Sequence, residues 1–163
     1  MGTKGREIVK LDVIELIELL NKAYADEWLA YYQYWVSAQI VKGKMKNAVV
    51  SELTEHAGDE LKHAEMLSER ILQLGGTPIT NITELNDRAN CKYAEPTNPD
   101  SVEILKQGID GERCAIDVYN KLLDIVAHKD SITYHVILEI LEDEVEHEDD
   151  FEVILEDIQR GGE

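Results

Sequence analysis

Residues 59–65 read DELKHAE, and residues 143–149 read DEVEHED. Both segments contain the pattern D-E-x-x-H, in which a glutamate and a histidine are three residues apart. On an α-helix this spacing places the two side chains on one face, about one turn apart. In both segments that face is the one on which the flanking sequence carries leucine and isoleucine. The two patterns therefore interrupt stripes that are predicted to be buried.

The sequence around these segments predicts four long helices. Apolar residues recur in steps of three and four, which is the period of a helix with one buried face. We place the helices at residues 11–41, 46–74, 101–127 and 131–159. Short links join the first helix to the second and the third to the fourth, so each pair is predicted to form an antiparallel hairpin.

The connection between the two hairpins is long. Residues 75–100, GGTPITNITELNDRANCKYAEPTNPD, contain all three prolines and are rich in glycine, asparagine and threonine. This composition is typical of a loop, although residues 82–89 could form a short helix within it. An extended loop of this length reaches ~80 Å, and a helix of this length spans ~40 Å. We therefore expect residues 1–163 to form one all-α domain, a ferritin-like four-helix bundle with a single long crossover between the second and third helices.

Three aspartate and glutamate positions mark the expected helix starts. Asp100 and Glu103 match a capping box for the third helix, in which each side chain binds a free backbone N–H group of the first turn. Asp130 is expected to be the N-cap of the fourth helix.

Six polar residues stand in the middle of the four apolar stripes. Burial of an unpaired carboxylate costs several kcal/mol, and four carboxylates at one level would repel one another. Two divalent cations would balance the charge of the four carboxylates and two neutral imidazoles. The sequence therefore predicts a dinuclear metal site, and oxygen and nitrogen ligands without thiolates favour iron or manganese over zinc. The predicted ligands are Glu27, Glu60, His63, Glu112, Glu144 and His147.

The spacing of these residues indicates an internal repeat. Glu60 follows Glu27 by 33 residues, and Glu144 follows Glu112 by 32. A tyrosine stands seven residues after the first glutamate of each hairpin. A single E-x-x-H on an acidic helix is usually a coincidence, but two that share this arrangement predict a site with pseudo-twofold symmetry.

Other residues near the predicted ligands have two interpretations each. Asp59 and Asp143 could each accept the free N–H group of a histidine on the neighbouring helix, or could be ordinary surface aspartates. Tyr34 and Tyr119 could donate to ligand carboxylates or pass an electron, or could be plain core aromatics. His56 lies one turn before Glu60, where we favour a hydrogen-bonded core histidine over an accessory metal ligand.

Two further histidines, His128 and His135, do not fit the ligand pattern. His128 stands in the predicted link between the third and fourth helices, and His135 stands at a helix start.

Bulk composition excludes several classes of function. The net charge of −18 opposes binding to phosphate backbones, so nucleic-acid binding is not expected. The same charge either attracts cations or simply keeps the protein in solution. No apolar run approaches the ~20 residues of a membrane span. The apolar part of the N-terminal segment is broken by Asp12, Glu15 and Glu18, which is a poor secretory signal, so we expect a cytoplasmic protein.

The six predicted ligands resemble the di-iron site of bacterioferritin. In that family one glutamate, a D-E-x-x-H, a second glutamate and a second D-E-x-x-H occur in this order and with nearly this spacing, and Tyr34 matches a tyrosine near the site. Leu61 stands where bacterioferritins carry the methionine that binds haem, so we expect no haem. The sequence ends at Glu163, a few residues after the fourth helix, so the fifth helix of bacterioferritin is not expected.

A second resemblance is closer. The segments NCKYAEPT and GERCAIDVY, which contain Cys91 and Cys114, resemble the cysteine pair of the Dps-like family, or thioferritins. Membership of this family implies a hollow homododecamer that oxidises Fe(II), preferably with hydrogen peroxide rather than O2, and stores the ferric product.

The cysteine pair leaves three possibilities open. Cys114 lies ~200° around its helix from Glu112, so it is expected to face away from the metals, where the crossover that carries Cys91 can cover it. The two cysteines could be free and buried, could form a disulfide, or could act as a redox-active thiol pair. We expect their Cα atoms to lie within the ~7 Å that a disulfide requires.

The sequence thus predicts a ferroxidase and iron-storage protein that binds two iron ions per subunit. The main alternative is a peroxidase or catalase of the same fold that cycles iron or manganese without storing it. A non-enzymatic helical scaffold with a vestigial site is less consistent with the six ligand residues.

Overall fold

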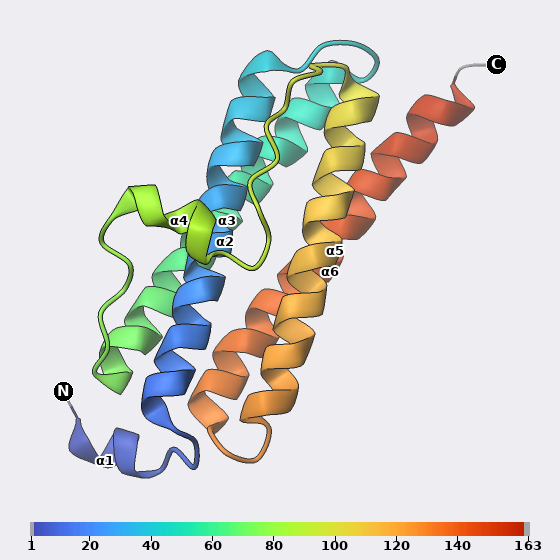
Figure 1. Ribbon diagram of the computed structural model, residues 1–163. Coiled ribbons are helices and arrows are strands. Elements are labelled where there is room, and N and C mark those ends of the chain that lie inside the picture. The colour runs from blue at the N-terminus through green and yellow to red at the C-terminus, as the bar shows by residue number, and fades with distance from the viewer. Residues whose placement is uncertain (1, 162–163) are drawn as a thin grey trace.

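The computed structural model describes residues 2–161 and shows two antiparallel helix pairs packed into a bundle (Figure 1). One pair joins α2 to α3, and the other joins α5 to α6. This is the predicted all-α, ferritin-like arrangement, and the four long helices begin and end within two residues of the predicted positions. The helices are α1 (Thr3–Glu7), α2 (Val13–Ile40), α3 (Lys46–Leu74), α4 (Leu85–Arg88), α5 (Ser101–Val126) and α6 (Ser131–Arg160).

The crossover between α3 and α5 runs from one end of the bundle to the other (Figure 1). It contains a 3-10 turn, Ile82–Glu84, and α4, which together form the short helix expected in this region. Its last residues are fixed at the far end of the bundle by two backbone hydrogen bonds. Lys42 N–H donates to the Pro99 carbonyl over 2.7 Å, and Ser101 N–H donates to the Lys42 carbonyl over 2.8 Å. The sequence pattern does not predict α1, because this short helix buries no side chain.

The capping box predicted for α5 is only half formed. Asp100 caps the helix by accepting the Val102 N–H over 3.0 Å. Glu103 does not return to the Asp100 N–H, which donates to the Asn98 side chain instead. The Glu103 carboxylate binds the Lys106 ammonium over 2.8 Å, because a cation one turn away is a stronger partner than a neutral amide that is already bonded.

Asp130 caps α6, as predicted, and it also joins α6 to α3. Its carboxylate accepts the backbone N–H groups of Ile132 and Thr133 and forms a 2.8 Å ion pair with Arg70 of α3. Both charged side chains are buried. Burial alone raises the pKa of Asp130, but the bonds from Thr133 and Arg70 outweigh it and keep this pKa below its usual value.

Two apolar clusters fill the bundle, one on each side of its middle. Between them lies the level at which the predicted ligands interrupt the stripes. The first cluster includes Tyr34, Leu53, Leu105 and Phe151, and the second includes Leu20, Leu67, Tyr119 and Ile140. Each cluster contains residues of all four long helices. Apolar packing on both sides therefore fixes the positions of the helices, and the six polar residues between the clusters do not have to hold the bundle together. Within residues 2–161, no helix has the length and hydropathy needed to span a membrane.

Two helical glycines should respond oppositely to alanine. A Cβ atom at Gly108 of α5 would lie 2.7 Å from Cε2 of Phe151, whereas a Cβ at Gly58 of α3 would meet no atom within 4 Å. We expect Gly108→Ala to lower the free energy of unfolding by ~1–3 kcal/mol through overpacking. Gly58→Ala should raise it by ~0.5–1 kcal/mol, because alanine favours the helix. Thermal unfolding followed by circular dichroism measures both changes, and a higher melting temperature for Gly108→Ala would contradict the predicted clash.

Candidate metal centre

The six side chains predicted as ligands converge at the middle of the bundle. Each of the four long helices contributes, α3 and α6 with a glutamate and a histidine and α2 and α5 with a glutamate. All six residues are at most 4 % exposed: Glu27, Glu60, His63, Glu112, Glu144 and His147.

Four of these residues form one half of the centre. Nδ1 of His63 lies 3.3 Å from Oε2 of Glu27, 3.3 Å from Oε2 of Glu60 and 3.2 Å from Oε1 of Glu144. One ligand atom from each of the four residues lies within 4.8 Å of the other three. This spacing suits a single cation bound by three carboxylates and one imidazole.

The other half repeats this arrangement around the second histidine. Nδ1 of His147 lies 3.6 Å from Oε1 of Glu60, 3.8 Å from Oε2 of Glu144 and 3.9 Å from Oε1 of Glu112. Glu60 and Glu144 therefore present one oxygen to each half. Two cations placed in the two halves would share these carboxylates as bridges, while Glu27 and Glu112 would each serve one cation.

Several buried atoms of the centre have no hydrogen-bond partner. They include Oε2 of Glu27, Oε1 of Glu60, Oε1 of Glu144 and Nδ1 of His147. Buried polar atoms in proteins are almost always bonded, and unpaired buried carboxylates are costly. Cations are the partners that fit, since all these atoms are electron-pair donors directed at the same small volume.

The outer nitrogens of the two histidines face aspartates of the opposite helix. Nε2 of His63 on α3 lies 2.9 Å from Oδ2 of Asp143 on α6. Nε2 of His147 on α6 lies 3.7 Å from Oδ2 of Asp59 on α3. A carboxylate at the outer nitrogen favours a proton there and leaves Nδ1 free to bind a metal.

The two tyrosines that follow the first glutamate of each hairpin contact the opposite hairpin. The Tyr34 hydroxyl donates to Oε1 of Glu112 over 2.5 Å, and the Tyr119 hydroxyl donates to Oε1 of Glu27. Each tyrosine thus orients the carboxylate that belongs to only one half of the centre. Burial, followed by the nearby carboxylates, raises the pKa of both hydroxyls, so both stay protonated donors.

The carboxylates of the centre favour a positive charge on the two imidazoles. Burial lowers the pKa of His147, but the nearby carboxylates of Glu144 and Glu60 outweigh burial and raise the pKa to about 10. The pKa of His63 is raised further by Glu144, Glu27 and Glu60. Burial and the neighbouring carboxylates raise the pKa of Glu27 and Glu112. Protons on the imidazoles therefore occupy the positions where cations would be bound.

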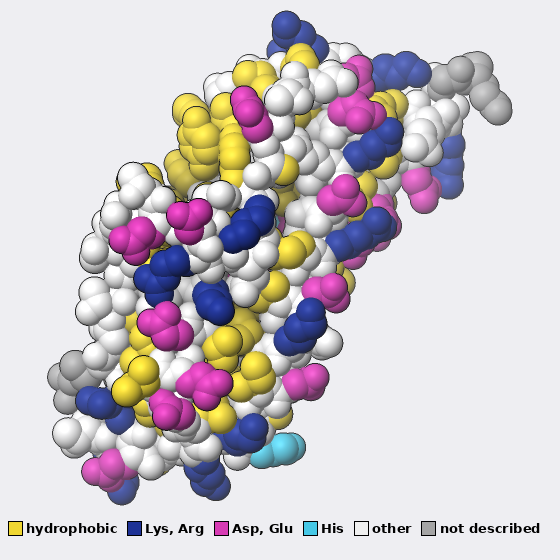
Figure 2. Space-filling view, viewed as in Figure 1, with side chains coloured by type: hydrophobic (Ala, Val, Ile, Leu, Met, Phe, Trp, Pro, Cys, Tyr) yellow, Lys and Arg dark blue, Asp and Glu magenta, His cyan; other side chains and the backbone are white. Residues whose placement is uncertain are grey.

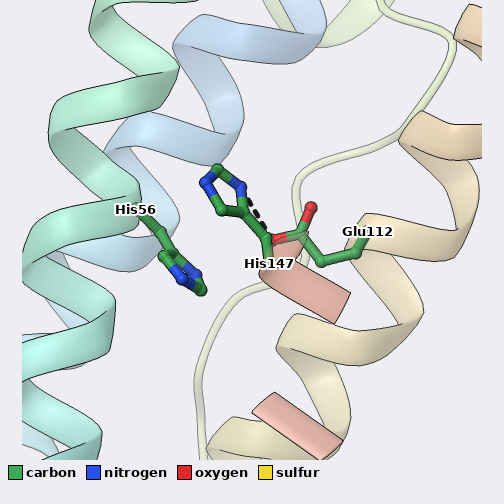
Figure 3. Close-up of side chains that lie close together, drawn as sticks. All are labelled: His56, Glu112 and His147. Carbon is green, nitrogen blue, oxygen red and sulfur yellow. Dashed lines mark ion pairs between the residues drawn. The ribbon is translucent and has the colours of Figure 1, made fainter. Parts of the chain in front are cut away.

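His56 is buried, as predicted, but the prediction that its ring would be hydrogen-bonded is wrong. It is 1 % exposed, and neither ring nitrogen has a hydrogen-bond partner in the described chain. The ring stacks on His147 with centroids 4.0 Å apart, and Glu112 lies on the far side of His147 (Figure 3). Burial lowers the pKa of His56 to about 3, so the ring is neutral. The lack of hydrogen-bond partners for His56 cannot be predicted from the sequence, since it depends on which side chains the packed helices bring next to the ring.

The remaining histidines lie away from the centre. His128 has a left-handed backbone with φ of 62° in the turn between α5 and α6. His135 is exposed on α6, where its Nε2 lies 3.9 Å from Glu139. Both positions agree with their exclusion from the ligand set.

A cavity of about 50 Å³ reaches the centre from the α2–α5 face. The crossover covers it, and Cys91, Lys92 and Tyr93 line it together with the four glutamates of the centre. Asp26 also lines this cavity, and sequence reasoning missed it. Its carboxylate accepts Nδ2 of Asn90 over 2.7 Å and the Cys91 N–H over 2.8 Å, while burial raises its pKa to about 6.

Cys91 and Cys114 form a disulfide that joins the crossover to α5. Their Cα atoms lie 6.0 Å apart, which confirms the expectation that the two residues are within disulfide reach. Free, unpaired cysteines are therefore the wrong interpretation. The bond holds the crossover over the cavity at Cys91, which is also one of the two residues that anchor Asp26.

Removal of this disulfide should destabilise the protein without emptying the metal centre. The bond closes a loop with a sequence separation of 23, which by chain entropy contributes ~3 kcal/mol. For a chain of this size the Cys91→Ser, Cys114→Ser variant should melt roughly 6–12 °C lower. Differential scanning calorimetry measures the shift, and Zn²⁺ titration should still give two ions per subunit at the dinuclear centre. Wild-type protein kept in reductant is the control, and an unchanged melting temperature in both samples would contradict the prediction.

The chain is similar to known proteins along most of its length. Residues 17–161 match the family described as ferritin-like domain. The dodecameric thioferritin from Bacteroides fragilis, a bacterioferritin-related protein, is 42 % identical. Its structure superposes with a TM-score of 0.95 over 98 % of this chain and 96 % of that chain.

Two curated relatives are also similar over most of their length. The DNA protection during starvation protein of Pyrococcus furiosus is 38 % identical over 160 residues, which are 95 % of this chain and 86 % of the relative. The bacterioferritin of Streptomyces coelicolor is 30 % identical over 150 residues, which are 91 % of this chain and 84 % of the relative. The chain therefore belongs to the ferritin-like proteins and, among them, to the Dps-like or thioferritin family.

Proposed function

We propose that this protein is a ferroxidase and iron-storage protein that protects against oxidative damage. The observation that carries the proposal is the two-part ligand arrangement, in which Glu60 and Glu144 each present one oxygen to either half of the centre. Two Fe(II) ions are the substrates, and the ligands are Glu27, Glu60, His63, Glu112, Glu144 and His147. The similarity to iron-storing relatives supports the same assignment.

The charge of the centre supports divalent cations as substrates. Four carboxylates and two neutral imidazoles carry four negative charges, which two divalent ions balance. Since the donors are oxygen and nitrogen without a thiolate, iron or manganese suits the site better than zinc. Leu61 offers no donor atom to a haem iron, so haem remains outside the proposal.

The reaction that we propose uses hydrogen peroxide as the oxidant, with O2 as a slower substitute. Each of two Fe(II) ions gives one electron, and one peroxide with two protons becomes two molecules of water. The protein positions the ions through the shared glutamates, while Tyr34 and Tyr119 hold the two unshared carboxylates in place. The cavity of about 50 Å³ on the α2–α5 face is lined by the four glutamates of the centre and has the volume to hold a molecule of this size beside them.

We propose a homododecamer as the storage form. The thioferritin that is 42 % identical over nearly the whole chain is described as dodecameric. Nucleic acid is not a proposed partner, although one relative is named for DNA protection. The net charge is −18, and on the face drawn in Figure 2 lysine and arginine side chains alternate with acidic ones instead of forming a basic patch.

The experiment that tests the proposal counts iron after oxidation. Purified assembly receives a large excess of Fe(II) and hydrogen peroxide without oxygen, and iron is then measured per shell after gel filtration. Far more iron than two ions per subunit is expected, in a particle with twelve times the 18.5 kDa mass of the chain. Two ions per subunit with continued peroxide consumption would instead show a peroxidase or catalase that stores nothing.

A further inference from the structure

We propose that Glu52, His56 and Asp150 form a third divalent-cation site, through which ions pass between the α3–α6 surface and the dinuclear centre. Binding at this site follows from its own residues. The passage of ions rests on the dinuclear function proposed above.

The three residues are spaced as metal ligands are. Nε2 of His56 lies 3.5 Å from Oδ2 of Asp150 and 3.7 Å from Oε2 of Glu52. One ligand atom from each lies within 4.8 Å of the other two. Glu52 and His56 are one turn apart on α3, and Asp150 reaches toward them from α6. Two carboxylates and one imidazole are a common donor set for Zn²⁺, Fe²⁺ and Mn²⁺.

The imidazole points to a ligand because it lacks any other partner. The His56 side chain is 2 % exposed, whereas the side chains of Glu52 and Asp150 are 29 % and 42 % exposed. Neither ring nitrogen makes a hydrogen bond with the described residues. Phe151 packs against the ring with centroids 4.5 Å apart. A buried polar group without a partner costs ~1–3 kcal/mol, and an apolar side chain would fill this place without that cost. A cation bound to the imidazole would remove the cost, because it would be the missing partner.

The position of His56 connects the surface carboxylates to the dinuclear centre. His56 forms a second close group with Glu112 and His147, whose ligand atoms also lie within 4.8 Å of one another. Figure 3 shows the His56 ring beside the His147 ring, with His147 paired to Glu112. A cation bound by His56 could thus pass directly to Glu112 and His147 in the dinuclear centre. The α3–α6 face lies across the bundle from the cavity on the α2–α5 face, so the oxidant and the ion have separate approaches.

The test measures how many zinc ions the intact assembly binds. Zn²⁺ is used because it does not change oxidation state. Isothermal titration calorimetry of the metal-free wild-type assembly should give three ions per subunit. The Glu52→Gln, Asp150→Asn variant should give two, since it removes both carboxylates of the proposed site and no residue of the dinuclear centre. The matched control is Glu65→Gln, Asp157→Asn, which makes the same change of charge at exposed positions of α3 and α6 and should still give three.

Diffraction at the zinc absorption edge locates the third ion. The expected peak lies between His56 and Asp150, about 2.0–2.2 Å from both ligand atoms, and it disappears in the Glu52→Gln, Asp150→Asn variant. Equal stoichiometry in wild type and variant, or no peak beside His56, would overturn the inference. Two zinc ions among the six central ligands with none beside His56 would overturn only this inference, whereas no zinc at the six ligands would overturn the proposed function.

Discussion

Fe(II) oxidation is expected to stop when Glu60 and Glu144 are both replaced by glutamine. Each carboxylate faces both halves of the centre, so the double variant removes two negative charges and replaces two of the four oxygens of Glu60 and Glu144 by amide nitrogens, which do not bind a cation. The loss of a charged partner costs ~1.5–3 kcal/mol per interaction, and each ~1.4 kcal/mol changes affinity tenfold. Iron binding, and with it the oxidation rate, should fall by at least about 100-fold.

The fold should survive this change. The two apolar clusters lie above and below the candidate ligands and contain residues of all four long helices, so the helix content should stay unchanged. Stopped-flow measurement of Fe(II) oxidation gives the rate, and circular dichroism gives the helix content. The control variant, Glu65→Gln with Glu146→Gln, changes exposed glutamates of the same two helices and should oxidise iron normally. A double variant at Glu60 and Glu144 with wild-type oxidation would refute the assignment of the centre.

The six candidate ligands could be predicted from the sequence because burial of charge breaks the apolar period of a helix. A glutamate at a position where leucine is expected, such as Glu27 or Glu112, is visible without any structure. The repeat of the pattern in the second hairpin then distinguishes a site from a coincidence. A contact between Asp59 or Asp143 and a histidine of the neighbouring helix could also be proposed from the sequence, because each aspartate directly precedes a candidate ligand glutamate.

Other features depend on tertiary contacts that no helical period encodes. His56 occupies an ordinary core position of α3, and its missing partners result from the packing of Phe151 and His147 around it. Asp26 becomes part of the cavity only because the crossover brings Asn90 and Cys91 against it. The capping box at Asp100 failed because Lys106, one turn further on, binds Glu103. In each case a residue far along the chain, or a competing charge, decides the outcome.

Binding of Zn²⁺ to the dinuclear centre is expected to raise the melting temperature by roughly 10–20 °C. A ligand at 100 times its dissociation constant stabilises the folded state by ~2.7 kcal/mol per site, so two sites give ~5 kcal/mol. A domain of this size gains about 2–4 °C per kcal/mol. Differential scanning calorimetry with and without Zn²⁺ measures the shift. The Glu60→Gln, Glu144→Gln variant is the control and should lose the part of the shift that comes from the dinuclear centre.

The size of this shift should increase with pH, because the metals replace protons. In the metal-free protein the carboxylates raise the pKa of His147 from 6.5 to about 10, so this imidazolium stabilises the fold fully below pH 6.5. That contribution is lost as the pH rises through about 10. Over the same range zinc no longer has to displace the proton and binds more tightly. Between pH 6.5 and about 10 the metal-free protein therefore loses stability, whereas the zinc-bound protein does not.

Calorimetric titration in buffers with different enthalpies of ionisation counts the protons directly. Near neutral pH we expect about two protons to leave for each pair of zinc ions, one from His63 and one from His147. Any proton held by Glu27 or Glu112, whose pKa values are also raised, adds to this number. Zinc binding without proton release, or a melting shift that shrinks as pH rises from 6.5 toward 10, would mean that the imidazoles are already neutral in the metal-free centre.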